Sequence, residues 1–375
     1  MRRTITLISL MVAVCLTIVL GLTLTAARQP ATPAAELTTG KVPLMSAGAL
    51  AFGPSGILLV GDSVGGSIVA IDTQDTKAAA SEVKVNVDGV DAKIAAMVGI
   101  AADQIVLNDI AVNPVSKNVY LSASRGRGPD AMPLIMRVDG SGKVTPVSLD
   151  NARYASVSLA DAPAANGNGR QNPRMQTITD MAYVNGNVLV AGLSNEEWSS
   201  ALRSIPYPFN AALKGATLQI WHSSHGRYET ESPIRTFVPY TIAGQQYVLA
   251  AYTCTPLVKI PVSAPKPGAK VKGMEIADLG AGNQPLDMVP YKKGGHDYIL
   301  IANSSFGVVK LKADNIETYP AINEPTVTDV AGVPYDKITN LSNVRHIAQV
   351  DDSNVLLLVA KPGAGAASLT TIALP

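Results

Sequence analysis

Short runs of apolar residues recur along most of the chain, and clusters of Gly, Pro, Asn and Asp separate them. Val-Leu-Val-Ala at 188–191 follows Asn185-Gly186, and Ile-Leu-Leu-Val at 57–60 follows Pro-Ser-Gly. Runs of this length between turn residues are typical of β-strands, and Asn-Gly is a strong hairpin signal. The pattern predicts an all-β protein in which the insert 91–105 is helical.

One stretch of this pattern occurs twice. Residues 236–260 and 287–311 align without a gap at an offset of 51 residues. The alignment pairs chemically matching residues: Tyr240 with Tyr291, Tyr247 with Tyr298, Ala251 with Ala302, and Lys259 with Lys310. Self-similarity at this period indicates a fold assembled from one supersecondary unit.

Weaker copies of the unit can be traced through the rest of the chain. With the two strong copies they give six units, which start at 49, 109, 180, 236, 287 and 346. A turn-forming sequence joins the first two strands of each unit. Six four-stranded units in a ring form a six-bladed β-propeller, and seven blades are the fallback.

The two ends of the chain are expected to share a blade. The last unit has three strands before the chain ends at Pro375, so its fourth strand is missing. The stretch 40–46, just ahead of the first unit, would supply that strand and leave no unpaired edge. The predicted propeller domain therefore spans 40–375, with the last blade closed by the N-terminal strand.

The first residues have the character of a targeting segment. Arg2 and Arg3 precede an apolar run at 5–24, and small residues end at Ala27. This pattern predicts a signal peptide over 1–27, or a membrane anchor if the segment is not cleaved, followed by a linker at 28–39. The protein is therefore expected to be exported, to the periplasm or the extracellular space. The membrane would be a partner only through an uncleaved N-terminal segment.

Composition removes one class of partner. The net charge is +1 and charged residues make up 16% of the chain, so nucleic-acid binding is not expected. Cys254 is the only cysteine outside the N-terminal segment, and no intrachain disulfide can form in the mature chain. The better interpretation of Cys254 is a structural thiol, because a nucleophile would need a base within hydrogen-bond reach.

Propeller geometry predicts where charged residues gather. The innermost strands of all blades begin on one face, here called the upper face, so their first residues surround one mouth of the central channel. These first-position residues are Ala49, Asp109, Asp180, Thr236, Asp287 and His346. Oxygen-rich rings suit Ca²⁺, and an imidazole extends the choice to other divalent metals. The candidate metal ligands are thus Asp109, Asp180, Asp287 and His346. In the alternative interpretation, each Asp caps backbone N–H groups of its own turn.

Loops between the second and third strands are expected to overhang the same mouth. Two of them are long, at 125–130 and 195–215. The candidate ligand-binding residues in or beside these loops and strand ends are Arg125, Asn195, Glu196, Arg203, Cys254 and Asn303. In the alternative, these residues pack against one another and seal the channel.

A second group of candidate ligands lies at 222–229. His222, His225 and Glu229 have residue types that bind zinc. The segment is predicted to form a tight turn between two outer strands, far from the mouth. A turn-stabilising role is therefore favoured over zinc.

The strand–turn–strand punctuation over 40–375 is similar to that of exported propellers of the NHL, YVTN and gluconolactonase-like type. The stretches 191–198, 225–230 and 252–258 also resemble a group of exported bacterial propellers that implies no particular activity.

We therefore expect a binding or scaffold module that uses its upper mouth, with a protein or a small molecule as partner. The alternative is a metal-dependent hydrolase of lactonase type, with Asp109, Asp180, Asp287 and His346 as ligands or general base. A weaker alternative is an accessory subunit of a periplasmic redox system.

Overall fold

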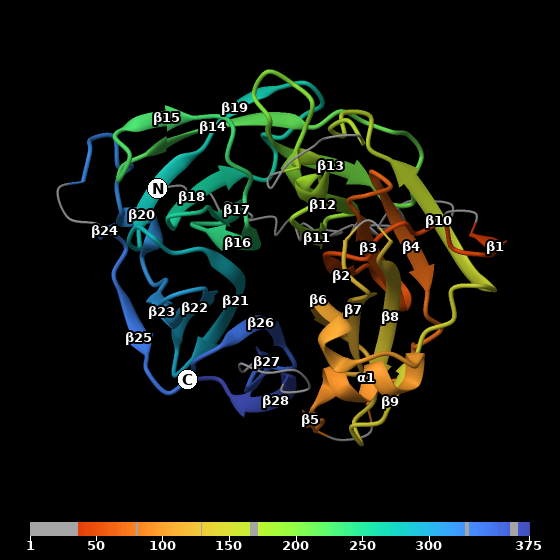
Figure 1. Cartoon of the computed structure of the whole chain (residues 1–375). Coiled ribbons are helices and arrows are strands. Elements are labelled where there is room, and N and C mark those ends of the chain that lie inside the picture. The colour runs from red at the N-terminus through yellow and green to blue at the C-terminus, as the bar shows by residue number, and fades with distance from the viewer. Residues whose placement is uncertain (1–36, 80–81, 129, 166–171, 327–329, 361–366) are drawn as a thin grey trace, which may run out of the picture. The chain divides into compact units, whose positions relative to one another are not determined.

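The computed structural model describes residues 37–79, 82–128, 130–165, 172–326, 330–360 and 367–375. These residues form a six-bladed β-propeller (Figure 1), which confirms the predicted fold class and blade number. The expected signal segment at 1–27 lies outside the described residues, whereas the first strand begins at Thr38, within the expected linker. Within the described ranges, no helix is long and apolar enough to cross a membrane.

Each blade is one sheet, and blades are numbered here by the chain order of their innermost strands. Blade 1 consists of β2 (Leu50–Phe52), β3 (Ile57–Asp62), β4 (Ser67–Asp72), β10 (Ala152–Ser158) and β1 (Thr38–Gly40). Blade 2 consists of β6 (Ile105–Val112), β7 (Val119–Arg125), β8 (Met132–Val138) and β9 (Val144–Pro146). Blade 3 consists of β11 (Asp180–Val184), β12 (Asn187–Leu193), β13 (Ser200–Pro206), β14 (Ala216–His222) and β15 (Arg227–Glu229), with β19 (Lys270–Lys272) parallel to β14.

The remaining blades come from the C-terminal half. Blade 4 consists of β16 (Thr236–Ile242), β17 (Gln245–Ala251), β18 (Pro256–Pro261), β20 (Met274–Asp278) and β24 (Ala331–Gly332). Blade 5 consists of β21 (Pro285–Lys293), β22 (His296–Asn303), β23 (Gly307–Lys312) and β25 (Tyr335–Ile338). Blade 6 consists of β26 (Val344–Gln349), β27 (Asn354–Ala360), β28 (Ala367–Ala373) and β5 (Asn86–Asp88).

Helical structure is sparse, as the apolar pattern predicts. The helix α1 (Val90–Val98) falls in the insert expected to be helical, and it ends at Gly99, whose φ of 70° suits a C-terminal glycine. Four short 3₁₀ turns complete the described helices: Pro54–Gly56, Ala102–Gln104, Pro173–Gln176 and Ile316–Thr318.

The apolar pattern is explained by packing between blades. Six apolar clusters form the core, and each lies between two neighbouring blades. Second strands such as β12 are covered on both faces, which accounts for their continuous apolar runs. Tight hairpins connect them to the inner strands. In the β11–β12 turn, Asn185 and Gly186 have φ of 49° and 80°, as a two-residue hairpin requires.

Blades do not follow one another around the ring in chain order. Contacts between innermost strands place the blades in the order 2, 1, 3, 4, 5, 6, with blade 6 next to blade 2. The described part of the chain therefore runs from blade 1 to blade 2 on one side, and returns through blade 1 to reach blade 3 on the other.

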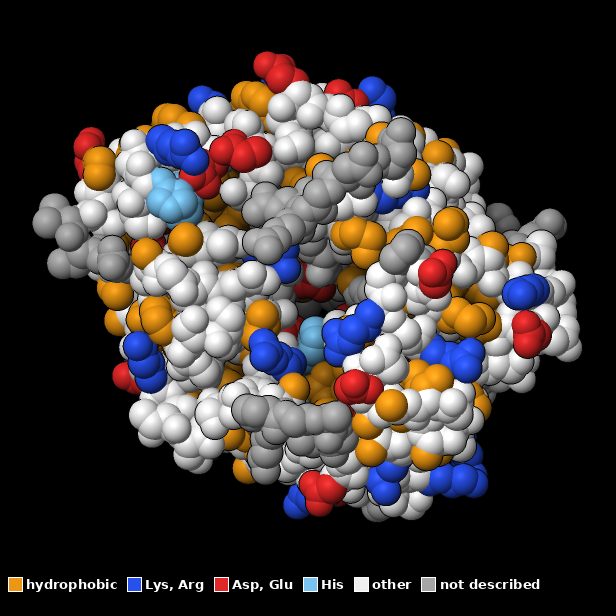
Figure 2. Space-filling view, in the orientation of Figure 1, with side chains coloured by type: hydrophobic (Ala, Val, Ile, Leu, Met, Phe, Trp, Pro, Cys, Tyr) orange, Lys and Arg blue, Asp and Glu red, His pale blue; other side chains and the backbone are white. Residues whose placement is uncertain are grey.

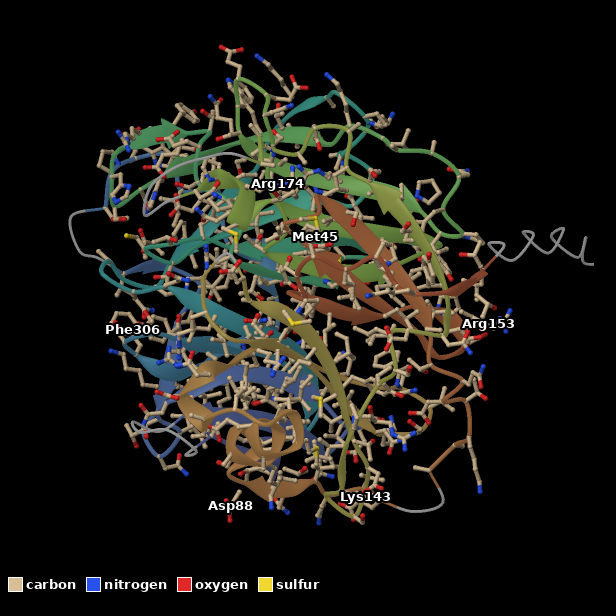
Figure 3. The ribbon with its side chains drawn as sticks, turned by 45° about the vertical axis from the view of Figure 1, so that its right-hand side comes forward. Met45, Asp88, Lys143, Arg153, Arg174 and Phe306 are labelled. Atoms are coloured by element: carbon tan, nitrogen blue, oxygen red, sulfur yellow. The ribbon has the colours of Figure 1, made fainter. Side chains whose placement is uncertain are left out.

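This order corrects the predicted closure. The fourth strand of blade 6 is β5, which pairs with β28, and not the N-terminal stretch 40–46. The N-terminal strand β1 instead pairs with β10 at the outer edge of blade 1. Figure 3 shows Asp88 of β5 and Arg153 of β10 in separate parts of the propeller. Blade 2 lies between blades 1 and 6. The segment that connects blade 1 to blade 2 contains β5, and β5 completes the sheet of blade 6.

Candidate functional site

The first-position residues meet at the upper mouth of the channel, as predicted. All six line one cavity of about 50 Å³, together with Asn108, Thr179, Arg235 and Leu286. Figure 2 shows acidic and histidine side chains inside the central hollow and basic side chains around it. Below this cavity lies a second one of about 210 Å³, and Asp109, Asp180 and Asp287 line both. The three carboxylates therefore lie where the two cavities adjoin.

Irregularities in three inner strands position some of these side chains. The registers of β6, β21 and β26 shift just before Asp109, Asp287 and His346. A β-bulge redirects the side chains around it and is frequent beside functional sites. These strands also begin earlier than predicted, at Ile105, Pro285 and Val344.

The side chain of each first-position Asp joins two blades by accepting hydrogen bonds from backbone N–H groups. Within its own strand, Oδ1 accepts the next residue's N–H, at 2.7 Å in all three cases: Ile110 to Asp109, Met181 to Asp180, and Met288 to Asp287. Oδ2 accepts an N–H from the neighbouring inner strand: Leu50 to Asp109 at 2.7 Å, Phe237 to Asp180 at 2.7 Å, and Ile347 to Asp287 at 2.9 Å. We call each arrangement a blade clasp.

Blade clasps alternate around the ring. In ring order the first positions read Asp109, Ala49, Asp180, Thr236, Asp287 and His346, so every Asp binds the inner strand of a neighbour that lacks one. Each Asp was expected to cap N–H groups of its own turn, whereas it accepts one N–H from the next residue of its strand and one from the next blade. Each clasp uses one lone pair of each oxygen, and the second can accept a further hydrogen bond or bind a cation.

His346 lies between two of the clasps. Its Nδ1 is 3.1 Å from Asp109 Oδ1 and 3.4 Å from Asp287 Oδ2, and the three side chains are 14–18% exposed. Burial alone would lower the pKa of His346. The hydrogen bonds to Asp109 and Asp287 and the charges of these two carboxylates instead raise the pKa of His346 to about 10. The imidazolium is therefore an internal cation between two carboxylates.

Asp180 lies apart from this group. One ligand atom each from Asp109, Asp287 and His346 can be chosen within 4.8 Å of one another, and Asp180 is not among them. Burial, followed by the charges of Asp287 and Asp109, raises the pKa of Asp180 well above its usual range. The same mouth thus brings together three of the four predicted metal ligands, and the surroundings of the fourth favour its neutral form.

The predicted ligand-binding residues lie outside the channel cavities. None of the six lines the two channel cavities. Arg203 is fully buried, and its guanidinium bonds Asp161, Thr177 O and Leu193 O. Asn303 is also buried and accepts a hydrogen bond from Asn283. These two residues hold the fold together and are not open to a ligand from solvent.

The other four predicted residues are more accessible. Cys254 is half-buried in a turn with φ of 63°, and its backbone N–H bonds Asn283 O. Asn195 is exposed, Glu196 forms an ion pair with Lys214 at 2.7 Å, and Arg125 is half-buried. Their ligand-binding role stays a prediction.

Sequence reasoning missed residues that directly precede the first positions. Asn108, Thr179, Arg235 and Leu286 line the mouth cavity. Arg235 is held by Gln176, with 3.2 Å between Nη1 and Oε1. The sequence offered one signal for these four residues: each directly precedes a first-position residue.

The opposite face also carries a cavity, which the sequence did not predict. It measures about 500 Å³ and lies where the inner strands of blades 4, 5 and 6 end. Its lining includes Tyr240 and Tyr291, the matching tyrosines of the internal repeat, together with Lys292 and Asp297. Tyr291 donates a hydrogen bond to Pro375 O at 2.6 Å, which ties this cavity to the C-terminus.

The sequence matches no known family model and no curated protein sequence. Among solved structures, a glucose dehydrogenase is similar at 13% identity over 91% of this chain and 99% of that chain, with a TM-score of 0.37. The PQQ-bound aldose sugar dehydrogenase from Streptomyces coelicolor is similar at 12% identity over 92% and 100%, with a TM-score of 0.33. Streptogramin B lyase is similar at 9% identity over 90% and 97%, also with a TM-score of 0.33.

At this similarity we infer function from the site itself. The resemblance to exported propellers is supported at the level of the fold, by the six blades. Membership of an exported family and the exported location stay predictions.

Proposed function

We propose that this propeller is a binding module whose upper mouth holds one divalent cation through Asp109, Asp287 and His346. One observation carries the proposal: two carboxylates and an imidazole converge at an ion-sized cavity on the channel axis. Blade clasps hold both carboxylates in position before any ion binds. A rigid donor set of this kind lowers the cost of binding an ion.

The donor types narrow the choice of ion. Ca²⁺ takes six to eight oxygen ligands, whereas this group contributes one nitrogen and two carboxylates. Imidazole with carboxylate suits a divalent transition metal with open positions for water or a partner. A metal on His346 would displace the imidazole proton, so binding should strengthen as the pH rises.

Cavity size favours binding over hydrolysis at this mouth. A lactonase-type reaction needs room for an organic substrate beside the ion, and ligand pockets usually exceed about 300 Å³. The two channel cavities measure about 50 and 210 Å³. A protein or small molecule would instead contact the ion's open positions from the upper face.

Metal content and thermal stability test the proposal. We expect the Asp109→Asn/Asp287→Asn variant to contain one ion per chain fewer than wild type, by elemental analysis after purification without chelator. Asp180→Asn is the matched control, because Asp180 forms the same clasp but lies outside the close ligand group. It should keep its ion.

Chelation provides the second measurement. EDTA should lower the melting temperature of wild type and of Asp180→Asn by more than that of the double variant, which lacks only the mouth site. Circular dichroism establishes that each variant is folded. A wild-type protein that contains no metal and does not respond to EDTA would refute the proposal, as would equal loss of metal in Asp180→Asn.

A further inference from the structure

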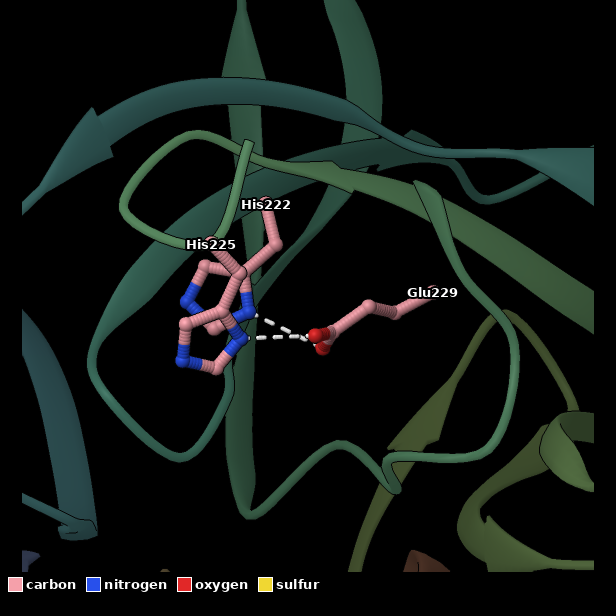
Figure 4. Close-up of side chains that lie close together, drawn as sticks. All are labelled: His222, His225 and Glu229. Atoms are coloured by element: carbon pink, nitrogen blue, oxygen red, sulfur yellow. Dashed lines mark hydrogen bonds and ion pairs between the residues drawn. The ribbon is translucent and has the colours of Figure 1, made fainter. Parts of the chain in front are cut away.

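Two histidines converge on one carboxylate at the outer part of blade 3, away from the mouth. His222 ends β14, Glu229 ends β15, and His225 lies in the turn between these paired strands. His222 Nδ1 is 2.9 Å from Glu229 Oε2, and His225 Nδ1 is 2.7 Å from Glu229 Oε1 (Figure 4). The centres of the two imidazole rings are 3.8 Å apart. A short hairpin thus aims two nitrogens at the same carboxylate.

Burial makes this group more than a surface ion pair. The side chains of His222 and Glu229 are 2% and 3% exposed, whereas that of His225 is 40% exposed. The Glu229 carboxylate contacts His222, His225 and Arg227. The exposed edge of His225 gives an ion access to it.

Two buried acids lie beside this group. The Oγ of the next residue, Ser223, is 2.8 Å from Glu275 Oε1 and 3.1 Å from Asp278 Oδ2. Arg227 contacts Glu229 at 3.2 Å, but its side chain is 63% exposed. The buried Nε2 of His222 has no hydrogen-bond partner among the described residues, so Glu229 is the polar partner that orients this ring.

We propose that His222 Nδ1, His225 Nδ1 and the Glu229 carboxylate form a second metal site, for Zn²⁺ or a similar transition-metal ion. Two imidazoles and one carboxylate are a common zinc ligand set, with a fourth position left for water. Tetrahedral bonds of about 2.1 Å would place the ligand atoms roughly 3.4 Å apart. Since the present separations are 2.7 and 2.9 Å, the group needs to open by about half an ångström. Movement of the exposed His225 can open its own contact with Glu229, and a shift of the carboxylate would open the contact with His222.

Cobalt titration tests this site separately from the mouth. The full chain carrying Asp109→Asn and Asp287→Asn serves as the parent, because it lacks the carboxylates of the proposed mouth site. Co²⁺ added to the parent should produce the visible ligand-field bands of a nitrogen- and oxygen-ligated ion, and Zn²⁺ should abolish them by competition. A parent that binds neither ion would overturn the proposal, whatever the result at the mouth.

Two variants identify the ligands. His225→Ala and Glu229→Gln in the parent should weaken Co²⁺ binding by more than about tenfold. The control is His296→Ala, because His296 also pairs with one carboxylate, Asp314, but has no second histidine. Its loss should leave the affinity within about twofold. Because the side chain of His225 is exposed, we expect the His225→Ala variant to fold. If this variant bound Co²⁺ as tightly as the parent does, the assignment of His225 as a ligand would be refuted.

Discussion

At the scale of single residues, His346 shows how one side chain can balance a crowded site. Its imidazolium lies between Asp109 and Asp287 and reduces the repulsion between them. The fold raises the pKa of His346 from 6.5 to about 10, so the folded state binds this proton more tightly than the unfolded chain does. The resulting stabilisation is fully present below pH 6.5 and is lost as the pH rises through about 10.

His346→Gln should remove this pH dependence. In the presence of chelator, we expect the free energy of unfolding of wild type to fall between pH 6.5 and 10 by up to about 3 kcal/mol more than that of the variant. Urea unfolding at a series of pH values measures the difference. Parallel pH profiles for the two proteins would show that His346 does not carry the charge that offsets the two carboxylates.

At the scale of elements, a buried ion pair ties the strands of blade 3 to the segment that leads into it. Arg203 of β13 bonds Asp161 at 2.7 Å, and Asp161 also accepts the N–H of Gly215. The same guanidinium bonds the carbonyl oxygens of Thr177 and Leu193. Charge, hydrogen bonds and burial together join β12, β13 and the segment before β11.

Arg203→Ala should therefore destabilise the protein strongly. Removing one partner of a buried pair leaves the other charge unpaired, at a cost of about 3–5 kcal/mol. The control is Arg153→Ala. Arg153 also pairs with an aspartate, Asp72, but its side chain is 52% exposed, so the variant should lose less than about 1 kcal/mol of unfolding free energy. Urea unfolding compares them, and similar losses would mean that the Arg203 pair adds nothing beyond a surface contact.

At the scale of the whole molecule, closure depends on strands borrowed from other parts of the chain. Blade 6 takes β5 from the segment between blades 1 and 2, and blade 1 takes β10 from the segment between blades 2 and 3. Val87 of β5 pairs with Leu369 and belongs to the apolar cluster between blades 2 and 6. A short strand therefore links the N-terminal part of the chain to its C-terminal blade.

Val87→Asp should open this closure. It places a charge in a buried apolar cluster, and we expect a loss of about 3 kcal/mol in the free energy of unfolding. The matched control, Thr39→Asp, changes the exposed outer strand β1 and should cost no more than about 0.5 kcal/mol. If the N-terminal strand closed the ring instead, Thr39→Asp would be the more damaging change.

The internal repeat shows what could be predicted from the sequence. Equivalent lysines lie over equivalent tyrosines in the two strong copies: Lys259 over Tyr247 and Lys310 over Tyr298. Such contacts lie within one blade, between strands that are neighbours in the chain. The same local regularity sets the phase of each inner strand, which is why six first positions could be placed at one mouth.

Roles of individual residues were harder to predict. Arg203 was expected to bind a ligand because it was placed in a long loop at 195–215, but it lies in β13 and its partner Asp161 is 42 residues away in sequence. Asp109 was assigned to the mouth correctly, yet its bond to Leu50 joins residues 59 apart. Sequence patterns show which residues are polar, but not which distant group will form a hydrogen bond or ion pair with each of them.

Taken alone, the sequence determined the all-β class, the number of blades and the ring of acidic residues with one histidine, because these depend on local strand and turn patterns. Tertiary structure decided the order of the blades, the strand that closes blade 6 and the partners of each carboxylate. It also brought His222 and His225 onto Glu229 as a buried group. These features depend on how the folded blades pack. Packing brings together residues that are far apart in the sequence, and the local pattern of strands and turns does not show which of them will meet.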